Sequence, residues 1–186
     1  MRFCSTKTYG HNIGLSCAFR QWRADSHCRL LHGYALAFKF VFEARELDHR
    51  NWVVDFGGLK SLKQQLELAF DHATIVASDD PELAWFQEAE RRGIARVIVT
   101  DGTGCERFAE FAYNLAASWL ERSDYADRVV IRSVEVMEHG ANSAIVERER
   151  RTVIKETALG GPSWDELYEA VKQNIRDMHA RGLLRV

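Results

Sequence analysis

The sequence predicts an α+β domain in which helices cover one face of an antiparallel sheet. Alternating apolar residues run from Tyr34 to Phe42 (Tyr34, Leu36, Phe38, Phe40 and Phe42), which is typical of a strand with one buried face. The elements expected along the chain follow the order β-β-α-α-β-α-β-β. This order lacks the regular βαβ alternation of a parallel sheet, so helices packed on an antiparallel sheet are favoured.

The composition is that of an ordinary globular domain. The chain has 186 residues, of which 46% are hydrophobic and 28% charged, and this length allows one domain with a full core. The net charge of -2 gives no reason to expect nucleic acid or a membrane surface as a partner. No apolar run reaches the roughly 18–20 residues that cross a bilayer, and the first residues lack the apolar core of a signal peptide. The irregularly spaced Cys4, Cys17, Cys28 and Cys105 are interpreted as free thiols, so we expect a cytoplasmic protein.

Periodicity places the elements of the first half. A strand is expected where four residues alternate, at Ile13, Leu15, Cys17 and Phe19. The polar residues 21–31 predict a loop before the strand that begins near Tyr34. A helix is then expected from the helical spacing of Leu59, Leu62, Leu66 and Phe70, and it should end near Asp71 and His72.

The second half continues with a helix from Pro81 to Arg92, which ends at Gly93, and a short strand at Val97–Val99. Thr103 and Glu106 fit a capping box that opens a long helix with the apolar stripe Phe108, Phe111, Ala112, Leu115 and Trp119. One face of a further strand is predicted to carry Val130, Val134, Val136 and Glu138, and residues 144–147 return as another strand. A charged stretch and an amphipathic terminal helix are expected to follow within residues 151–186.

Side chains that could take part in catalysis are concentrated between His27 and Tyr34. A cysteine near a histidine can be a nucleophile or base, because a neighbouring imidazolium or metal lowers the thiol pKa. Cys28 and His32 have this relation, with Gly33 next to them. The alternative is that Cys28 is a small buried apolar residue, the ordinary environment of an isolated cysteine.

Three further positions carry candidate groups. Asp71 could orient the imidazole of His72, although a histidine at a helix end also interacts favourably with the helix dipole. Glu106 could face a ligand or only complete the capping box. Glu138 stands on an otherwise apolar strand face, and a buried carboxylate needs a charged partner, hydrogen bonds or a ligand.

The order of these motifs resembles one enzyme family. Cys28-x3-His32-Gly33, Asp55-Phe56-Gly57, Asp71-His72, Glu106 at a helix start and Glu138 at a strand end are similar to the motifs of the tunnelling-fold 6-pyruvoyl-tetrahydropterin and 6-carboxytetrahydropterin synthases. The resemblance covers roughly residues 10–148. It implies a four-stranded antiparallel sheet with two helices on one face, in a homo-trimer or homo-hexamer. Residues 1–150 would form the pterin-binding domain, and residues 151–186 a charged linker and terminal helix.

The resemblance also implies a set of roles. Cys28, Asp71 and His72 would transfer protons, Glu138 would bind the aminopyrimidine edge of a pterin, and Cys105 and Glu106 would line the same pocket. The activity implied is that of a lyase acting on dihydroneopterin triphosphate or a related pterin, in tetrahydropterin or deazapurine (queuosine) biosynthesis. The alternative is a zinc-free, non-catalytic oligomer that binds a pterin or purine.

The chain departs from the family at the metal. The family binds zinc through three histidines, and here Phe19 and Tyr34 occupy two of these positions, which leaves His32. Catalytic zinc needs about three protein ligands. His11, Cys17 or His27 could in principle supply a missing ligand, but no spacing in the sequence requires it.

Overall fold

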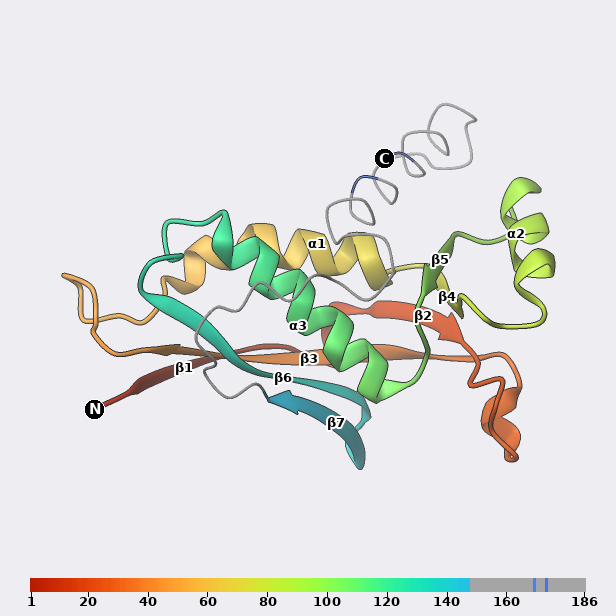
Figure 1. Ribbon diagram of the computed structural model, residues 1–186, viewed down its shortest axis with the longest axis horizontal. Helices are drawn as coiled ribbons and strands as arrows, with labels where there is room; N and C mark the ends of the chain where they lie inside the picture. Colours follow the sequence, from red (N-terminus) through yellow and green to blue (C-terminus); the bar gives the residue numbers. More distant parts are fainter. Residues whose placement is uncertain (148–168, 170–172, 174–186) are drawn as a thin grey trace.

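The computed structural model describes residues 1–147 together with Glu169 and Gln173. Within this part of the chain, seven strands form one sheet that carries three α-helices (Figure 1). The strands are β1 (Phe3–Tyr9), β2 (Leu15–Phe19), β3 (His32–Ala44), β4 (Ala73–Ala77), β5 (Val97–Thr100), β6 (Val129–His139) and β7 (Asn142–Glu147). The helices are α1 (Lys60–Phe70), α2 (Leu83–Arg91) and α3 (Cys105–Glu121).

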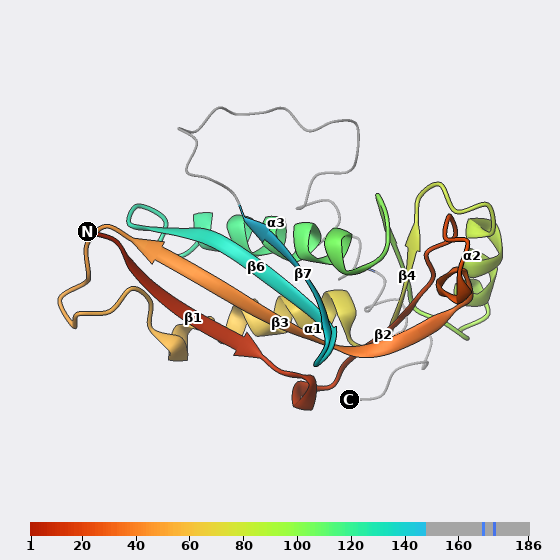
Figure 2. The same cartoon turned by 90° about the horizontal axis from the view of Figure 1, so that it is seen from below.

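The sheet is organised around the long strand β3. The order is β5-β4-β2-β3-β6-β7, and β1 also pairs with β3. β1 and β2 pair with successive halves of the same β3 edge, which Figure 2 shows from the uncovered face. These pairs and the β3–β6 and β6–β7 pairs are antiparallel, whereas β4 runs parallel to β2, and β5 parallel to β4. We call β1, β3, β6 and β7 the antiparallel part, and β2, β4 and β5 the parallel edge.

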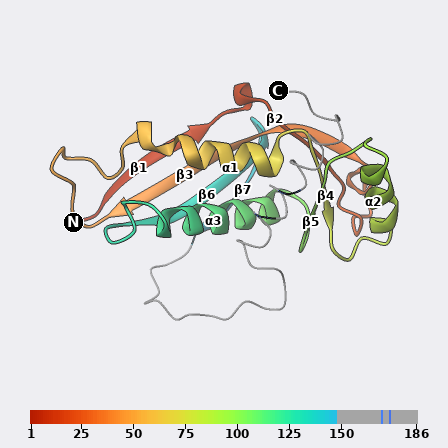
Figure 3. The same ribbon diagram turned by 90° about the horizontal axis from the view of Figure 1, so that it is seen from above.

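The main core lies between the sheet and helices α1 and α3, which run side by side over one face (Figure 3). Phe38, Phe40 and Phe42 of β3 are completely buried beneath them. The predicted stripe of α3 is buried as well, at Phe108, Phe111, Ala112, Leu115 and Trp119. Apolar periodicity therefore predicted both layers of this core.

Helix α2 lies apart from α1 and α3, at the end of the molecule where β4 and β5 extend the sheet (Figure 1). It follows Pro81 and ends before Gly93, whose φ of 71° is the left-handed conformation that glycine adopts readily. Phe86 of α2 packs with Val76 of β4 and Val97 of β5 in a small cluster separate from the main core.

Strand β6 contains a bulge at Arg132. Val41 of β3 pairs with Ser133, but the next residue of β3, Phe42, pairs with Ile131, so Arg132 is the extra residue. The buried residues are consequently Val129 and Ile131 before the bulge, and Val134 and Val136 after it. The predicted face of this strand was therefore wrong at Val130 and right at Val134 and Val136.

The α+β class is confirmed, but its details needed correction. The expected four-stranded antiparallel sheet with two helices is a mixed sheet with a third helix, because β4 and β5 add in parallel at the edge of β2. The capping box at the start of α3 was also wrong. Gly104 is the N-cap without a side-chain hydrogen bond, and the Thr103 hydroxyl donates to the carbonyl of Arg20 instead.

The expected division at residue 150 and the terminal helix lie outside the described residues. Among the helices that are described, none is long and apolar enough to cross a membrane.

Candidate functional site

Glu138 and Cys105 meet where the end of β6 approaches the first turn of α3. Glu138 is half-buried, and the thiol of Cys105, a residue only 8% exposed, is hydrogen-bonded to it. Burial, with the negative charges of Glu138 and Glu106, raises the pKa of Cys105 to about 12. The thiol therefore keeps its proton at neutral pH and can donate it to the carboxylate. Cys105 is suited to orient Glu138 and unsuited to act as a nucleophile.

The first turn of α3 is also close to the segment after β2. A Cβ atom on Gly104 would collide with the side-chain amide of Gln21, and the φ of 104° at Gly104 again favours glycine. Glu106 is exposed on this first turn. Three of the predicted substrate-binding residues, Glu138, Cys105 and Glu106, are thus brought together.

Aromatic rings fill the neighbouring end of the sheet. Phe19 of β2 pairs with His32 of β3, and their ring centroids lie 4.7 Å apart. The ring of Tyr34 lies 5.8 Å from that of His32 and 6.0 Å from that of His139 on β6. Phe108 of α3 packs edge-on against Phe19 from the core side, at 4.9 Å. The three positions at which the resemblance implies zinc ligands therefore converge in one ring cluster.

This cluster does not fit a zinc ion. Phe19 is completely buried and has no donor atom, so His32 and the phenol of Tyr34 are the donors of the trio. Nδ1 of His32 is hydrogen-bonded to the carbonyl of Leu30 at 2.7 Å, and Nδ1 of His11 to that of Ala35 at 2.6 Å, which leaves Nε2 as the one ring nitrogen that each histidine could offer to a metal. Within the described residues, no group of three or more His, Cys, Asp or Glu side chains is arranged to hold a metal.

Cys28 lies in the loop that connects β2 to β3. It is half-buried within a short 3-10 turn, His27–Arg29, which Ser26 caps by accepting a hydrogen bond from the Cys28 backbone N–H at 3.3 Å. Its carbonyl accepts a hydrogen bond from the backbone N–H of Gln21 at 2.9 Å. A backbone hydrogen bond therefore joins Gln21, near the start of the loop, to Cys28.

Asp71 and His72 form a hydrogen-bonded pair between α1 and β4. Oδ1 of Asp71 lies 2.8 Å from Nδ1 of His72, whose side chain is 86% exposed. His72 has a φ of 52°, and a residue other than glycine in this region costs about 1 kcal/mol or more, which is often tolerated at functional sites. The buried guanidinium of Arg96 holds the pair in place by donating to the carbonyl of Asp71.

The pair and the thiol do not meet within one chain. Ala73 pairs with Cys17, and Ile75 with Phe19, so His72 lies level with the start of β2. The loop of Cys28 leaves the other end of β2, about 10 Å further along at the usual rise of a strand. In the part of the chain that the structure describes, no hydrogen bond or ion pair joins Cys28 to Asp71 or His72.

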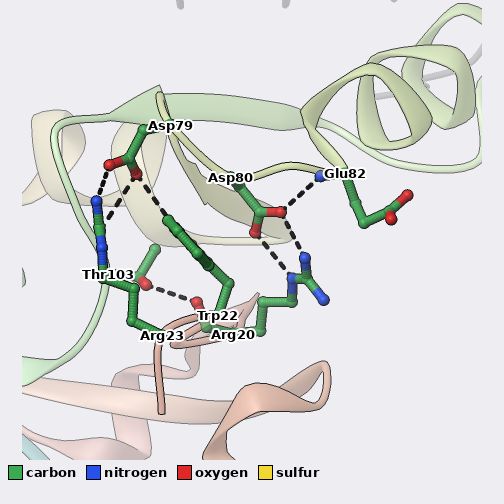
Figure 4. Close-up of polar contacts among 7 residues, drawn as sticks. All are labelled: Arg20, Trp22, Arg23, Asp79, Asp80, Glu82 and Thr103. Atoms are coloured by element: carbon green, nitrogen blue, oxygen red, sulfur yellow. Dashed lines mark hydrogen bonds and ion pairs between the residues drawn. The ribbon is translucent and has the colours of Figure 1, made fainter.

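Sequence analysis missed the residues that fix the Cys28 loop. Arg20, directly after β2, makes two hydrogen bonds to Asp80 in the β4–α2 connection, and Arg23 and Trp22 contact Asp79 beside it (Figure 4). Sixty positions separate Arg20 from Asp80, and charged residues at such a distance leave no local pattern. The Asp79-Asp80-Pro81 run before a helix was the one available signal.

Comparison with known proteins identifies the family of this chain. Residues 11–149 match the family model described as 6-pyruvoyl tetrahydropterin synthase, which is well over half of the chain. The chain belongs to this family. The matched range includes every candidate residue from Phe19 to Glu138. No curated protein sequence matches the chain.

Solved structures, among them 6-pyruvoyl tetrahydropterin synthases, share the fold. An uncharacterized protein, WS1659 from Wolinella succinogenes, is 21% identical with a TM-score of 0.63, and the match covers 80% of this chain and 98% of that one. A catalytic-residue mutant of the Plasmodium vivax 6-pyruvoyltetrahydropterin synthase is 14% identical, with a TM-score of 0.61 and the same coverage. The Caenorhabditis elegans synthase is 16% identical with a TM-score of 0.51, covering 80% and 96%.

Proposed function

We propose that this chain binds a pterin, or a related bicyclic purine-like molecule, through Glu138. The observation that carries the proposal is the half-buried Glu138 carboxylate, hydrogen-bonded to a protonated Cys105 thiol and close to the start of α3. The aminopyrimidine edge of a pterin presents two adjacent N–H donors, and a carboxylate accepts such a pair by two charge-assisted hydrogen bonds. Tyr34 and His139, at the same end of the sheet, offer aromatic surfaces to a planar ligand.

The reaction we propose is elimination on dihydroneopterin triphosphate or a related pterin. Cys28, as thiolate, would take a proton from the substrate side chain, and the electron pair of the broken C–H bond would expel the triphosphate by breaking its C–O bond. His72, oriented by Asp71, would return a proton to the product. The geometry that supports this step is the 2.8 Å hydrogen bond between Asp71 and His72 and the strained backbone of His72.

Such a reaction requires more than one copy of the chain, because the thiol and the Asp71–His72 pair lie apart in a single copy. His72 is exposed beside a sheet whose strands β1 and β7 each pair on one side within the described residues. We propose a homo-trimer or homo-hexamer in which Asp71 and His72 of one subunit face Cys28 of another. Sedimentation tests this, since a monomer at micromolar concentration contradicts the shared site.

A second function is favoured by the ring cluster. In this proposal the buried Phe19 replaces a zinc ligand of the family, so the metal that would polarise the substrate side chain would not be held. A pterin-binding or purine-binding oligomer without turnover would retain Glu138 and Cys105 and would not need the proton-transfer residues.

One experiment separates the two functions. The purified chain is titrated with neopterin by fluorescence and then incubated with dihydroneopterin triphosphate, while mass spectrometry follows the pterin and the released phosphate. Binding with product formation supports the enzyme, and binding without product supports the non-catalytic oligomer. Absence of neopterin binding contradicts both.

A further inference from the structure

We propose that the buried ion pair of Arg20 with Asp80 is the positioning device for Cys28. We define the thiol loop as residues 20–31, which connect β2 to β3. In this proposal Arg20 and Asp80 touch neither substrate nor the reacting atoms, and they act by holding the thiol loop against the parallel edge of the sheet. The inference deepens the proposed function, because Cys28 is a residue of that site.

The contact itself is well built. Nε of Arg20 donates to Oδ2 of Asp80 at 2.8 Å, and Nη2 donates to Oδ1 at 2.5 Å (Figure 4). This side-by-side arrangement suits the planar guanidinium and is the geometry in which arginine differs most from lysine. The Asp80 side chain is 1% exposed, and the hydrogen bonds from Arg20 hold its pKa below the ordinary value. Oδ1 of Asp80 also accepts the backbone N–H of Glu82, which fixes it to the start of α2.

The anchor reaches Cys28 through the backbone. The carbonyl of Arg20 accepts a hydrogen bond from the Thr103 hydroxyl at 2.6 Å, so its side chain is held by the connection after β4 and its main chain by the connection after β5. The next residue, Gln21, donates its N–H to the carbonyl of Cys28 at 2.9 Å. A single hydrogen bond therefore joins Cys28 to the residue beside the ion pair.

The same residue reaches the other half of the site. The side chain of Gln21 lies so close to Gly104 that a Cβ atom there would collide with it. Gly104 precedes Cys105, whose thiol is hydrogen-bonded to Glu138. A shift of Arg20 would thus move Gln21, and through it both Cys28 and the start of α3 next to Glu138.

The far end of the thiol loop faces α2 across a hollow. A hollow of about 260 Å³ separates this part of the loop from α2, and it is lined by Arg20, Arg29, Leu30, Leu31, Glu82, Trp85 and Phe86. Arg20 lines this hollow and also makes the contact with Asp80. Loss of its contact with Asp80 would allow the loop to move away from α2.

The chain supplies a matched control in the neighbouring pair. Arg23 and Asp79 join the same two loops, but their side chains are 63% and 46% exposed. Exposed ion pairs contribute little, whereas removal of one partner from a buried pair leaves a desolvated charge without compensation. If any ion pair between these loops could position Cys28, substitutions in the two pairs would change the Cys28 alkylation rate equally.

The test measures alkylation of Cys28 by iodoacetamide, resolved by peptide mass spectrometry across a neutral-to-alkaline pH series. The exposed Cys4 in the same molecules is the internal reference. Because release of the loop exposes the half-buried thiol, we expect Arg20→Gln and Asp80→Asn each to raise the Cys28 rate relative to Cys4 by about fivefold or more. The double variant should not exceed the single variants, since they break the same contact.

Arg20→Lys keeps the charge and should restore part of the native rate, while Arg23→Gln and Asp79→Asn should leave it unchanged. Circular dichroism confirms that each variant is folded, and Arg20→Lys keeps the test decisive if Arg20→Gln is not. Equal effects of the Arg20 and Arg23 variants, or an unchanged Cys28 rate in Asp80→Asn, would overturn the proposal. The readout needs no pterin, so a chain that fails to bind neopterin but shows the expected rates contradicts the proposed function and supports the positioning role.

Discussion

In the antiparallel part of the sheet, Phe38, Phe40 and Phe42 are completely buried beneath two helices, and this layer ends at Glu138. In the parallel edge, the separate apolar cluster is small, and the contacts that reach the thiol loop are charged. The carboxylate end of the candidate site is therefore positioned by apolar packing, and the thiol end by a buried ion pair. Each half of the site can be perturbed by a different kind of substitution.

The largest expected effect is a gain of zinc binding at the point where the two regions meet. Phe19 belongs to the parallel edge and His32 and Tyr34 to the antiparallel part, with ring centroids 4.7, 5.8 and 6.2 Å apart. Three imidazoles on a tetrahedral zinc would lie about 5 Å apart. We expect the native chain to retain little zinc, and the double variant Phe19→His/Tyr34→His to retain about one zinc per chain. Elemental analysis checks both, and near-stoichiometric zinc in the native chain that is lost in His32→Ala contradicts the expectation.

Core truncations should separate the two regions by stability. Phe40→Ala removes a fully buried ring under α1 and α3 and should lower the free energy of unfolding by about 4 kcal/mol. Phe86→Ala should cost about 2 kcal/mol, because half-buried neighbours such as Leu83 can close over the smaller cluster. Urea denaturation measures both, and equal losses would show that the parallel edge is as tightly packed as the main core.

Glu138→Gln tests the carboxylate end. The substitution keeps the shape but replaces an acceptor oxygen with a donor, so neopterin affinity should fall at least about tenfold, or about 1.4 kcal/mol. Glu135→Gln is the matched control, because Glu135 is also half-buried on β6 but forms an ion pair with Lys39. Equal affinities for native and Glu138→Gln protein would assign Glu138 a structural role.

The smallest effect is a loss of stability at alkaline pH. Burial raises the pKa of both Cys17 and Cys105 from 9.0 to about 12. Above pH 9 the unfolded chain releases these protons while the folded chain keeps them, so stability falls as the pH rises toward 12. At pH 9.5 the expected loss is about 0.8 kcal/mol for each thiol. Cys17→Ala should remove its share of this slope in urea titrations, and Cys4→Ala should not alter it.

Periodicity predicted β3 and the core helices, together with β2 and β5, but it missed the strands β1 and β4. β3, α1 and α3 carry long apolar repeats, and these were placed correctly. Strand β4 has only five residues and follows α1 through the left-handed His72, so it offered neither length nor a turn signal. Of the candidate site, the grouping of Glu138 with Cys105 and Glu106 was predicted, whereas Arg20 and Asp80 were not. Their pairing depends on the crossing of β2 and β4, which no local pattern records.

The bulge at Arg132 decides on which side of the sheet the carboxylate of Glu138 lies. Side chains alternate along a strand, so a regular β6 continuing from Ile131 would turn residues 133, 135 and 137 toward the helices. Glu138 would then face the uncovered side, away from Cys105. Deletion of the single codon for Arg132 would remove the bulge yet keep Val134, Val136 and Glu138 facing the helices, because the alternation from Ile131 would then continue through Ser133. The side of the sheet on which the proposed pterin site lies is thus set by one extra residue in β6, six positions before the carboxylate.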